Sequence, residues 1–239
     1  MFIKKAMILA AGRGERMRPL TDVCPKPLIS VDGAPMIDHI LNHLEEIGIQ
    51  HVVVNTSYMG KMFHEYLRQR KTPHISFSDE DTPLETGGGV LKALPELGKE
   101  PFFVINGDVV WSDDKSNCLK DLSEAWKEGM KGLLLVVPKN QAQGYQGDGD
   151  YDMTPSHHLV RRLTASKASY VFSGIQILHP AAFVGKQPGC FSLNTIYDAL
   201  EKEKSLYGLK HRGLWFHVGT PEHLTSTREW FDHHREETT

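Results

Sequence analysis

Short apolar runs, separated by stretches with helical spacing, dominate the first half of the chain. Apolar residues cluster between polar or turn residues at 6–11, 51–55, 102–106 and 132–137, which predicts buried strands. Apolar positions recur every three or four residues from Ile37 to Ile47, before Gly48, and again from Met59 to Leu67, which predicts two helices. Strands that alternate with helices predict an α/β fold, with a doubly wound, mixed but mostly parallel sheet and helices on both faces.

The second half of the chain has a different pattern. Residues 141–158 are rich in Gly, Asp and Gln and predict an exposed loop. Strands are predicted at 170–178, 206–210 and 215–218, and a last helix is predicted to begin at Pro221 with Thr220 as its N-cap. The chain has 239 residues, 40% of them hydrophobic, and no internal repeat, so we expect a single domain, 1–239.

Charge and cysteine content narrow the range of functions. The formal net charge is -3 and no long basic run occurs, which argues against nucleic-acid and membrane partners. The N-terminal apolar run is too short for a signal peptide, and no stretch approaches the ~20 apolar residues of a membrane span, so we expect a cytoplasmic protein. The three cysteines, Cys24, Cys118 and Cys190, form no CxxC pattern, which argues against a disulfide framework and against a cysteine zinc site.

The segment from Leu9 to Thr21, LAAGRGERMRPLT, carries the clearest chemistry. Its glycines would let backbone amides approach phosphate oxygens, and its arginines would offset negative charge as pyrophosphate leaves. Met17 replaces the third glycine of a dinucleotide-binding fingerprint, and no Walker-type lysine follows the glycines. The alternative is a generic glycine turn with solvated arginines.

Two further charged residues fit the same chemistry. Lys26 lies between Pro25 and Pro27, whose rings restrict the backbone on both sides, and this stiff mounting predicts a phosphate contact rather than a surface lysine. Asp108 follows the predicted strand 102–106, at the sheet edge where ligands of open α/β sheets bind. Its carboxylate is a hard oxygen ligand of the kind Mg²⁺ prefers, although an aspartate there can also cap a turn.

These residues resemble the motif LAAGxGxRxxPLTxxxPKPL of the sugar-1-phosphate nucleotidyltransferases, which residues 9–28 match almost throughout. The resemblance continues through PLETGGG at 83–89, NGD at 106–108, FSGI at 172–175 and GT at 219–220, and so spans the chain. Within the family, the sequences of the PLETGGG and FSGI motifs are most similar to those of the N-acetylmuramate alpha-1-phosphate uridylyltransferases. The resemblance implies a Rossmann-like fold of the nucleotide-diphospho-sugar transferase type. It also implies a nucleotide-binding half at about 1–110 and a sugar-binding half at about 111–239.

The resemblance implies transfer of a nucleotidyl group from a nucleoside triphosphate to a sugar 1-phosphate, which gives a nucleoside diphosphate sugar and pyrophosphate. UTP and N-acetylmuramate 1-phosphate, in peptidoglycan recycling, are the favoured substrates, and GTP with mannose 1-phosphate or a heptose 1-phosphate is the alternative. A non-catalytic nucleotide-sugar binding or regulatory protein is a third possibility. The chain shows no extra C-terminal domain of the kind that assembles some relatives, so we expect a monomer or a weak homodimer.

The resemblance gives three residues catalytic roles. Lys26 would bridge the alpha phosphate and the sugar phosphate, Arg16 would hold the leaving pyrophosphate, and Asp108 would bind Mg²⁺. Arg18 is expected either near phosphate or in a structural ion pair.

His217 stands where the family has a second metal-binding aspartate. Its imidazole suits Mn²⁺ or another divalent ion better than Mg²⁺. It would ligate such an ion, hydrogen-bond a phosphate oxygen or a metal-bound water, or mark a weakened enzyme. We favour the hydrogen bond.

Base and sugar selection are expected in two places. We expect Gly87 to Gly89 to form a loop against the base or ribose, and Glu80 or Glu85 to accept a ring N–H, a geometry that suits guanine while the resemblance suits uracil. The predicted nucleotide-binding residues are Leu9, Ala10, Ala11, Gly12, Arg13, Gly14, Asn55, Glu80, Glu85, Gly87 and Gly88. The predicted sugar-binding residues are Asn106, Gly149, Asp150, Ser173 and Gly174. Arg161 and Arg162 alternate in a predicted strand, so at most one would meet the lactyl carboxylate of a muramic acid.

Overall fold

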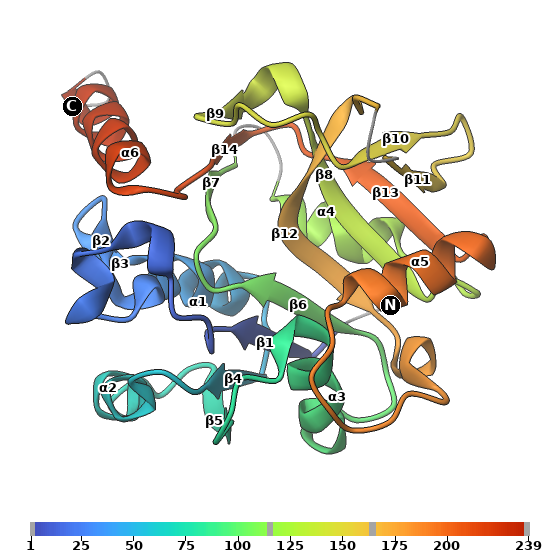
Figure 1. Ribbon diagram of the computed structural model, residues 1–239, viewed down its shortest axis with the longest axis horizontal. Coiled ribbons are helices and arrows are strands. Elements are labelled where there is room, and N and C mark those ends of the chain that lie inside the picture. Colours follow the sequence, from blue (N-terminus) through green and yellow to red (C-terminus); the bar gives the residue numbers. More distant parts are fainter. Residues whose placement is uncertain (1–2, 114–116, 163–165, 237–239) are drawn as a thin grey trace.

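A central mixed sheet organises the computed structural model, which describes residues 3–113, 117–162 and 166–236 (Figure 1). Within these residues the strand order is β11-β10-β12-β6-β1-β4-β5; β8 also pairs with β12, and β13 pairs with β8. The strands are β1 Lys5–Leu9, β4 His51–Thr56, β5 His74–Asp79, β6 Phe102–Asn106, β8 Gly132–Pro138, β10 Tyr151–Met153, β11 Leu159–Arg161, β12 Tyr170–Leu178 and β13 Leu206–Lys210. Strands β6, β1, β4 and β5 are parallel, whereas β12 runs antiparallel to β6 and β8. The predicted α/β class and mixed sheet are confirmed.

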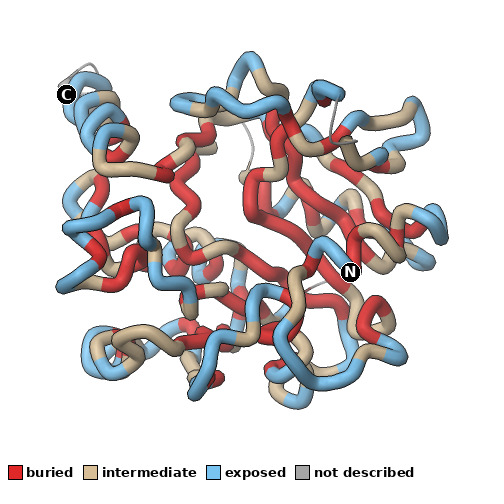
Figure 2. Tube along the Cα trace, in the orientation of Figure 1, coloured by how far each residue is buried: buried red, intermediate tan, exposed pale blue. Residues whose placement is uncertain are grey.

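Helices cover both faces of this sheet. They are α1 Met36–Glu46, α2 Gly60–Leu67, α3 Glu85–Leu97, α4 Cys118–Ala125 and α5 Asn194–Lys202, whereas α6 Pro221–Glu236 lies apart from the central sheet. Side chains alternate along β1, so Ile8 packs with residues of α1 and α4 on one face, while Met7 packs with residues of α3 and α5 on the other. The buried residues therefore follow the central strands, and exposed residues mark the loops and α6 (Figure 2).

Two small sheets accompany the central sheet. One pairs β7 Val110–Ser112 with β14 Leu214–Phe216 and adds β9 Ala142–Gln143, and the other pairs β2 Ser30–Val31 with β3 Ala34–Pro35. Short 3-10 helices lie at Glu15–Met17, Leu20–Asp22, Lys26–Leu28, Lys139–Gln141 and Pro180–Phe183. Because β14 lies beside β7, the segment that follows it returns to the end of the central sheet.

Helix α6 completes the return of the chain to its N-terminal part (Figure 1). Leu224 of α6 packs in one apolar cluster with Met17 and Val31, and Arg228 donates two hydrogen bonds to the Ser30 carbonyl oxygen. The arginine-bearing loop is therefore held between the first strand and the last helix.

Several sequence predictions of local structure were wrong. The predicted exposed loop at 141–158 contains β9 and β10, and Gly87 to Gly89 lie in the first turns of α3 rather than in a loop. Three adjacent glycines disfavour a helix, and this helix forms because its glycine face packs closely against other segments. None of the described helices has the length and apolar character needed to cross a bilayer.

Candidate active site

The loop after β1 is shaped by Gly14, whose φ of 63° lies in the left-handed region. A Cβ at Gly14 would lie 3.0 Å from Thr21 Cγ2 and 3.2 Å from Lys26 Cβ. The Thr21 hydroxyl also donates a hydrogen bond to the Gly14 carbonyl oxygen at 3.0 Å. Glycine at this position therefore lets the phosphate loop close against the segment that carries Lys26. By contrast, nothing lies within 4 Å of the corresponding Cβ position at Gly12, which leaves open space at the loop.

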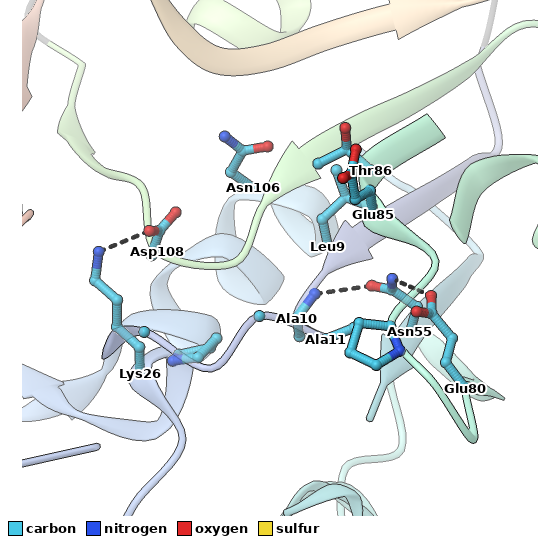
Figure 3. A pocket seen from close by; sticks show the side chains of 14 residues that line it. Leu9, Ala10, Ala11, Lys26, Asn55, Glu80, Glu85, Thr86, Asn106 and Asp108 are labelled. Carbon is cyan, nitrogen blue, oxygen red and sulfur yellow. Dashed lines mark hydrogen bonds and ion pairs between the residues drawn. The ribbon is translucent and has the colours of Figure 1, made fainter. Parts of the chain in front are cut away.

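Gly107 brings three motifs together. Its N–H donates a hydrogen bond of 2.8 Å to the Leu9 carbonyl oxygen, and a Cβ there would lie 2.8 Å from that oxygen and 3.0 Å from Pro27. This close approach sets Lys26 beside Asp108, with 2.7 Å between Nζ and Oδ2 (Figure 3). The Lys26 side chain is 9% exposed and the Asp108 side chain 42% exposed, so the ammonium is sheltered while the carboxylate reaches solvent.

A first cavity of about 380 Å³ lies beside this pair, at the carboxyl ends of β1, β4 and β6. Ala10 N–H donates to Asn55 Oδ1 at 2.8 Å, and Asn55 Nδ2 donates to Glu80 Oε1 at 2.7 Å (Figure 3). This chain fixes the orientation of the Asn55 amide in the cavity wall. The lining residues are Leu9, Ala10, Ala11, Gly12, Gly14, Lys26, Pro27, Asn55, Glu80, Pro83, Glu85, Thr86, Asn106 and Asp108.

The three glycines of α3 serve packing. A Cβ at Gly87 would lie 2.5 Å from the Phe191 ring, and one at Gly88 would lie 2.1 Å from the Gly189 carbonyl oxygen. The N–H groups of Gly87 and Gly88 both donate to the Phe191 carbonyl oxygen. A Cβ at Gly89 would meet Asn55 and Glu80 at 2.8 Å, so this glycine makes room for the polar chain. The expectation that these glycines form a loop against the base is therefore corrected.

A second cavity, of about 240 Å³, shares Lys26, Asn106 and Asp108 with the first. Its other lining residues are Arg16, Val109, Tyr145, Asp150, Val171, Phe172, Ser173, Gly174, Trp215, Phe216, His217, Val218 and Gly219. The shared residues mark the junction where molecules held in the two cavities would meet. Sequence motifs from both halves of the chain therefore converge on Lys26 and Asp108.

Some predicted site residues lie outside both cavities. The Arg13 guanidinium lies 5.9 Å from the centre of the Tyr58 ring. Arg18 forms an ion pair of 3.1 Å with Asp22, which is the structural alternative expected for it. Gly149 lines neither cavity, but its N–H donates to the Tyr145 hydroxyl at 3.2 Å and thereby supports the wall of the second one.

Sequence reasoning gave no role to four aromatic residues of the second cavity, Tyr145, Phe172, Trp215 and Phe216. Trp215 Nε1–H donates to the Ser173 carbonyl oxygen at 2.9 Å, which ties β14 to the FSGI motif of β12. Tyr145 lies in the segment expected to be an exposed loop, and Phe172 lies inside the motif FSGI. Strand β12 is irregular between Phe172 and Gln176, and Val171, Phe172, Ser173 and Gly174 all line the cavity, so strand alternation gives no signal for Phe172.

His217 lines the second cavity together with Arg16, Lys26 and Asp108. Burial lowers the pKa of His217, and the positive charges of His223, Arg16 and Lys26 lower it further, so the imidazole is neutral near pH 7. A Cβ at Gly219 would lie 2.6 Å from His217 Nε2, so glycine makes room for the ring. A neutral imidazole beside two cations can donate or accept one hydrogen bond toward a bound anion.

A third hollow, of about 760 Å³, adjoins the second through Asp150 and Phe172, which line both. Arg161 and Arg162 both border it, because β11 ends at Arg161 and strand alternation does not continue to the next residue. The expectation that they point to opposite sides is therefore wrong. Arg161 is paired with Asp198 at 2.6 Å, and Arg162 donates to the Gly149 carbonyl oxygen at 2.8 Å.

Comparison with known proteins identifies the family. The family model for nucleotidyl transferases matches residues 5–148. The chain belongs to the nucleotidyl transferase family. This nucleotidyltransferase is 36% identical over 226 residues to the N-acetylmuramate alpha-1-phosphate uridylyltransferase of Caulobacter vibrioides, which covers 92% of this chain and 93% of the relative.

A second relative differs in base and sugar. The nucleotidyltransferase is 31% identical over 226 residues to the mannose-1-phosphate guanylyltransferase catalytic subunit beta of Danio rerio, covering 91% of this chain and 62% of the relative. The fold matches a solved UDP-glucose pyrophosphorylase complexed with UDP-glucose, with a TM-score of 0.77, 18% identity and coverage of 96% and 98%. The chain is thus an enzyme of the sugar-1-phosphate nucleotidyltransferase family, as the motifs implied.

Proposed function

We propose that the enzyme transfers uridylyl from UTP to N-acetylmuramate 1-phosphate, with the first cavity as the nucleotide site and the second as the sugar phosphate site. The observation that carries the proposal is the junction of the two cavities at Lys26, Asn106 and Asp108. A sugar phosphate in one cavity and a triphosphate in the other would place an attacking oxygen beside the alpha phosphorus. In this proposal residues 1–110 form the nucleotide half of one domain, and 111–239 form the sugar half.

Positioning and charge neutralisation supply most of the rate in such a reaction, because both reactants are anions. The attacking oxygen of the sugar phosphate forms the new bond to the alpha phosphorus as the bond to pyrophosphate breaks. Lys26 contacts the alpha phosphate and the sugar phosphate at this junction, and Arg16, at the rim of the second cavity, neutralises the leaving group. The sheltered Lys26 ammonium is screened less by water than a surface lysine would be.

Asp108 is the residue that we propose for Mg²⁺ binding. Its carboxylate is 42% exposed at the cavity junction, and only Oδ2 is in contact with Lys26, so a hard oxygen ligand faces the space expected for phosphates. These features fit an ion that is held by one or two carboxylates together with substrate phosphates. When bound, Mg²⁺ would offset negative charge on the triphosphate.

The Glu80 geometry supports uracil over guanine. Glu80 is 4% exposed, and its two oxygens already accept hydrogen bonds, Oε1 from Asn55 Nδ2 at 2.7 Å and Oε2 from Leu84 N–H at 2.8 Å. A carboxylate that pairs with the two adjacent N–H groups of guanine needs both oxygens directed at the base. Glu80 instead orients the Asn55 amide, which leaves the exposed Glu85 as the carboxylate at the cavity edge.

The adjoining third hollow supports a sugar with a carboxylate substituent. Arg161, Arg162 and Lys202 border it together with Asp150, Asp198 and Glu201, so the hollow offers cations to a lactyl carboxylate without being positive overall. Arg161 retains its Asp198 partner, which positions the guanidinium along the wall. The 36% identity to an N-acetylmuramate alpha-1-phosphate uridylyltransferase supports the same choice.

Pyrophosphate release with a panel of substrates tests the proposal. UTP, GTP, CTP and dTTP are each paired with the 1-phosphates of N-acetylmuramate, glucose, mannose and a heptose. We expect kcat/KM to be highest for UTP with N-acetylmuramate 1-phosphate, by about 100-fold over the pairs that lack the lactyl carboxylate. A preference for GTP with mannose or heptose 1-phosphate would support the second candidate, which the 31% identical guanylyltransferase subunit motivates. Tight binding of nucleotide sugars without release from any pair would instead indicate a binding protein.

Exchanging His217 for aspartate tests the role of this histidine. A hydrogen-bonding imidazole predicts that His217→Asp lowers kcat by about 10-fold, through repulsion between carboxylate and phosphate, and leaves the ratio of rates with Mg²⁺ and Mn²⁺ unchanged. Steady-state rates with each ion check this, and His223→Asn, at a ring 5.2 Å from His217, is the neighbouring control. A shift of the ratio toward Mg²⁺ in His217→Asp would contradict this expectation and place the side chain of residue 217 within reach of the ion.

A further inference from the structure

A separate polar cluster lies where β7, α4 and the turn between β13 and β14 meet. Among the described residues, one potential ligand atom each from Asp113, Cys118 and His211 lies within 4.8 Å of the other two. Cys118 is 3% exposed and His211 2% exposed, and none of the three lines either of the two cavities assigned to the reaction. The cluster is therefore distinct from the Asp108 site.

Backbone packing holds these side chains together. Ser112 of β7 pairs with Leu214 of β14, and a Cβ at Gly213 would lie 2.1 Å from the Ser112 carbonyl oxygen, so the turn that carries His211 sits directly against β7. Asp113 Oδ1 accepts a hydrogen bond of 3.1 Å from the Cys118 N–H, which fixes the carboxylate beside the first turn of α4.

The tautomer of His211 leaves the lone pair of one ring nitrogen, Nδ1, buried in the protein. Its Nε2 lies 3.2 Å from the Leu214 carbonyl oxygen, and a carbonyl can only accept, so Nε2 carries the hydrogen. Nδ1 is then an acceptor, and it is buried without a hydrogen-bond partner among the described residues. Burial lowers the pKa of His211, so the ring stays neutral. A buried acceptor without a donor is costly unless a cation binds it, and an imidazole oriented by a carbonyl is the usual arrangement of metal-binding histidines.

We propose that Asp113, Cys118 and His211 bind a zinc-type divalent cation outside the reaction site. One thiolate and one carboxylate balance the charge of the ion, and a sulfur, nitrogen and oxygen ligand set selects Zn²⁺ over Mg²⁺. Tetrahedral bonds of about 2.0–2.3 Å separate neighbouring ligand atoms by about 3.5 Å, so the side chains need to close by about 1 Å. His43 Nδ1, 4.0 Å from Asp113 Oδ2 and buried without a hydrogen-bond partner in the part of the chain described, or a water completes the shell.

The cluster can be reached from the surface. A hollow of about 510 Å³ reaches Asp113, His43 and Asn117, and gives an ion a path from the surface. Burial, and the negative charges of Asp113 and Asp121, raise the pKa of the Cys118 thiol, so the thiol is protonated without an ion and metal binding has to release that proton. A bound ion would link the start of α4 to the turn before β14, the strand that leads to His217.

Cobalt is the spectroscopic probe for this site. Chelator-treated protein is titrated with Co²⁺, and one equivalent per chain should produce thiolate-to-cobalt charge transfer and tetrahedral visible bands, which Zn²⁺ then abolishes. Cys118→Ser should remove the charge-transfer band and weaken Zn²⁺ binding by about 100-fold or more. Cys24→Ser and Cys190→Ser, which change the two other free cysteines, should retain the band. The band should also persist in Asp108→Asn, because the reaction site is elsewhere.

Two results would overturn the proposal. If the wild-type protein gives no thiolate band with Co²⁺, the cluster is a buried hydrogen-bonding group and not a metal site, and this conclusion holds whether or not the variants fold. If the band survives Cys118→Ser, another cysteine is the ligand. Neither result depends on the proposed substrates, since the cobalt spectrum is recorded without nucleotide or sugar.

Discussion

Replacing Lys26 with alanine is expected to lower kcat for pyrophosphate release by about 100- to 1000-fold while the protein remains folded. The Lys26 ammonium lies at the junction of the two cavities and is only 9% exposed, so its charge acts with little screening on the phosphates that meet there. The Asp108 carboxylate that loses its partner is 42% exposed and can be solvated. Truncation also removes the packing of the buried lysine stem, so we expect the free energy of unfolding to fall by about 0.5–3 kcal/mol.

Steady-state kinetics and urea unfolding of Lys26→Ala check this expectation. Lys71→Ala is the matched control, because Lys71 is exposed and lines neither cavity. Turnover of Lys26→Ala near the wild-type value would refute a catalytic role for the lysine. A large loss of unfolding free energy would instead show that the Lys26–Asp108 pair is mainly structural.

Several strands could be predicted from short, mostly apolar segments of the sequence. The strands at 102–106, 170–178 and 206–210 have the predicted bounds, and the apolar run at 102–106 is typical of a strand buried on both faces. Helix α3 was missed, because its N-terminal glycines have low helix propensity and its stability comes from contact with Phe191 and Gly189. Because these contacts come from residues more than a hundred positions away, the local sequence around the glycines does not indicate a helix.

In the candidate site, too, some residues were predicted from sequence motifs, whereas others depend on contacts between distant segments. The sequence resemblance brought Lys26 and Asp108 into one prediction, and the structure places them 2.7 Å apart. The wall of the second cavity depends on tertiary pairing, as between Trp215 and Ser173, which neither spacing nor motif revealed. The sequence also showed no sign of the cluster formed by Asp113, Cys118 and His211, because the cysteine spacing argues against a zinc site. His211 comes close to the other two residues only because β14 pairs with β7.

Asp108→Asn should lower kcat by about 1000-fold, because the amide is neutral and a poorer Mg²⁺ ligand. A metal ion stabilises the transition state by several kcal/mol, and each 1.36 kcal/mol that is lost slows the reaction about tenfold. The fold should persist, since the side-chain amide oxygen of the variant can still accept a hydrogen bond from the sheltered Lys26 ammonium. Chelation of divalent ions should abolish turnover of the wild-type enzyme reversibly, whereas raising Mg²⁺ should not restore the variant. Asp232→Asn, at an exposed position of α6, is the control for charge removal. Full turnover of Asp108→Asn, or wild-type turnover that resists chelation, would remove Asp108 from the metal site and leave Lys26 and Arg16 to neutralise the phosphates alone.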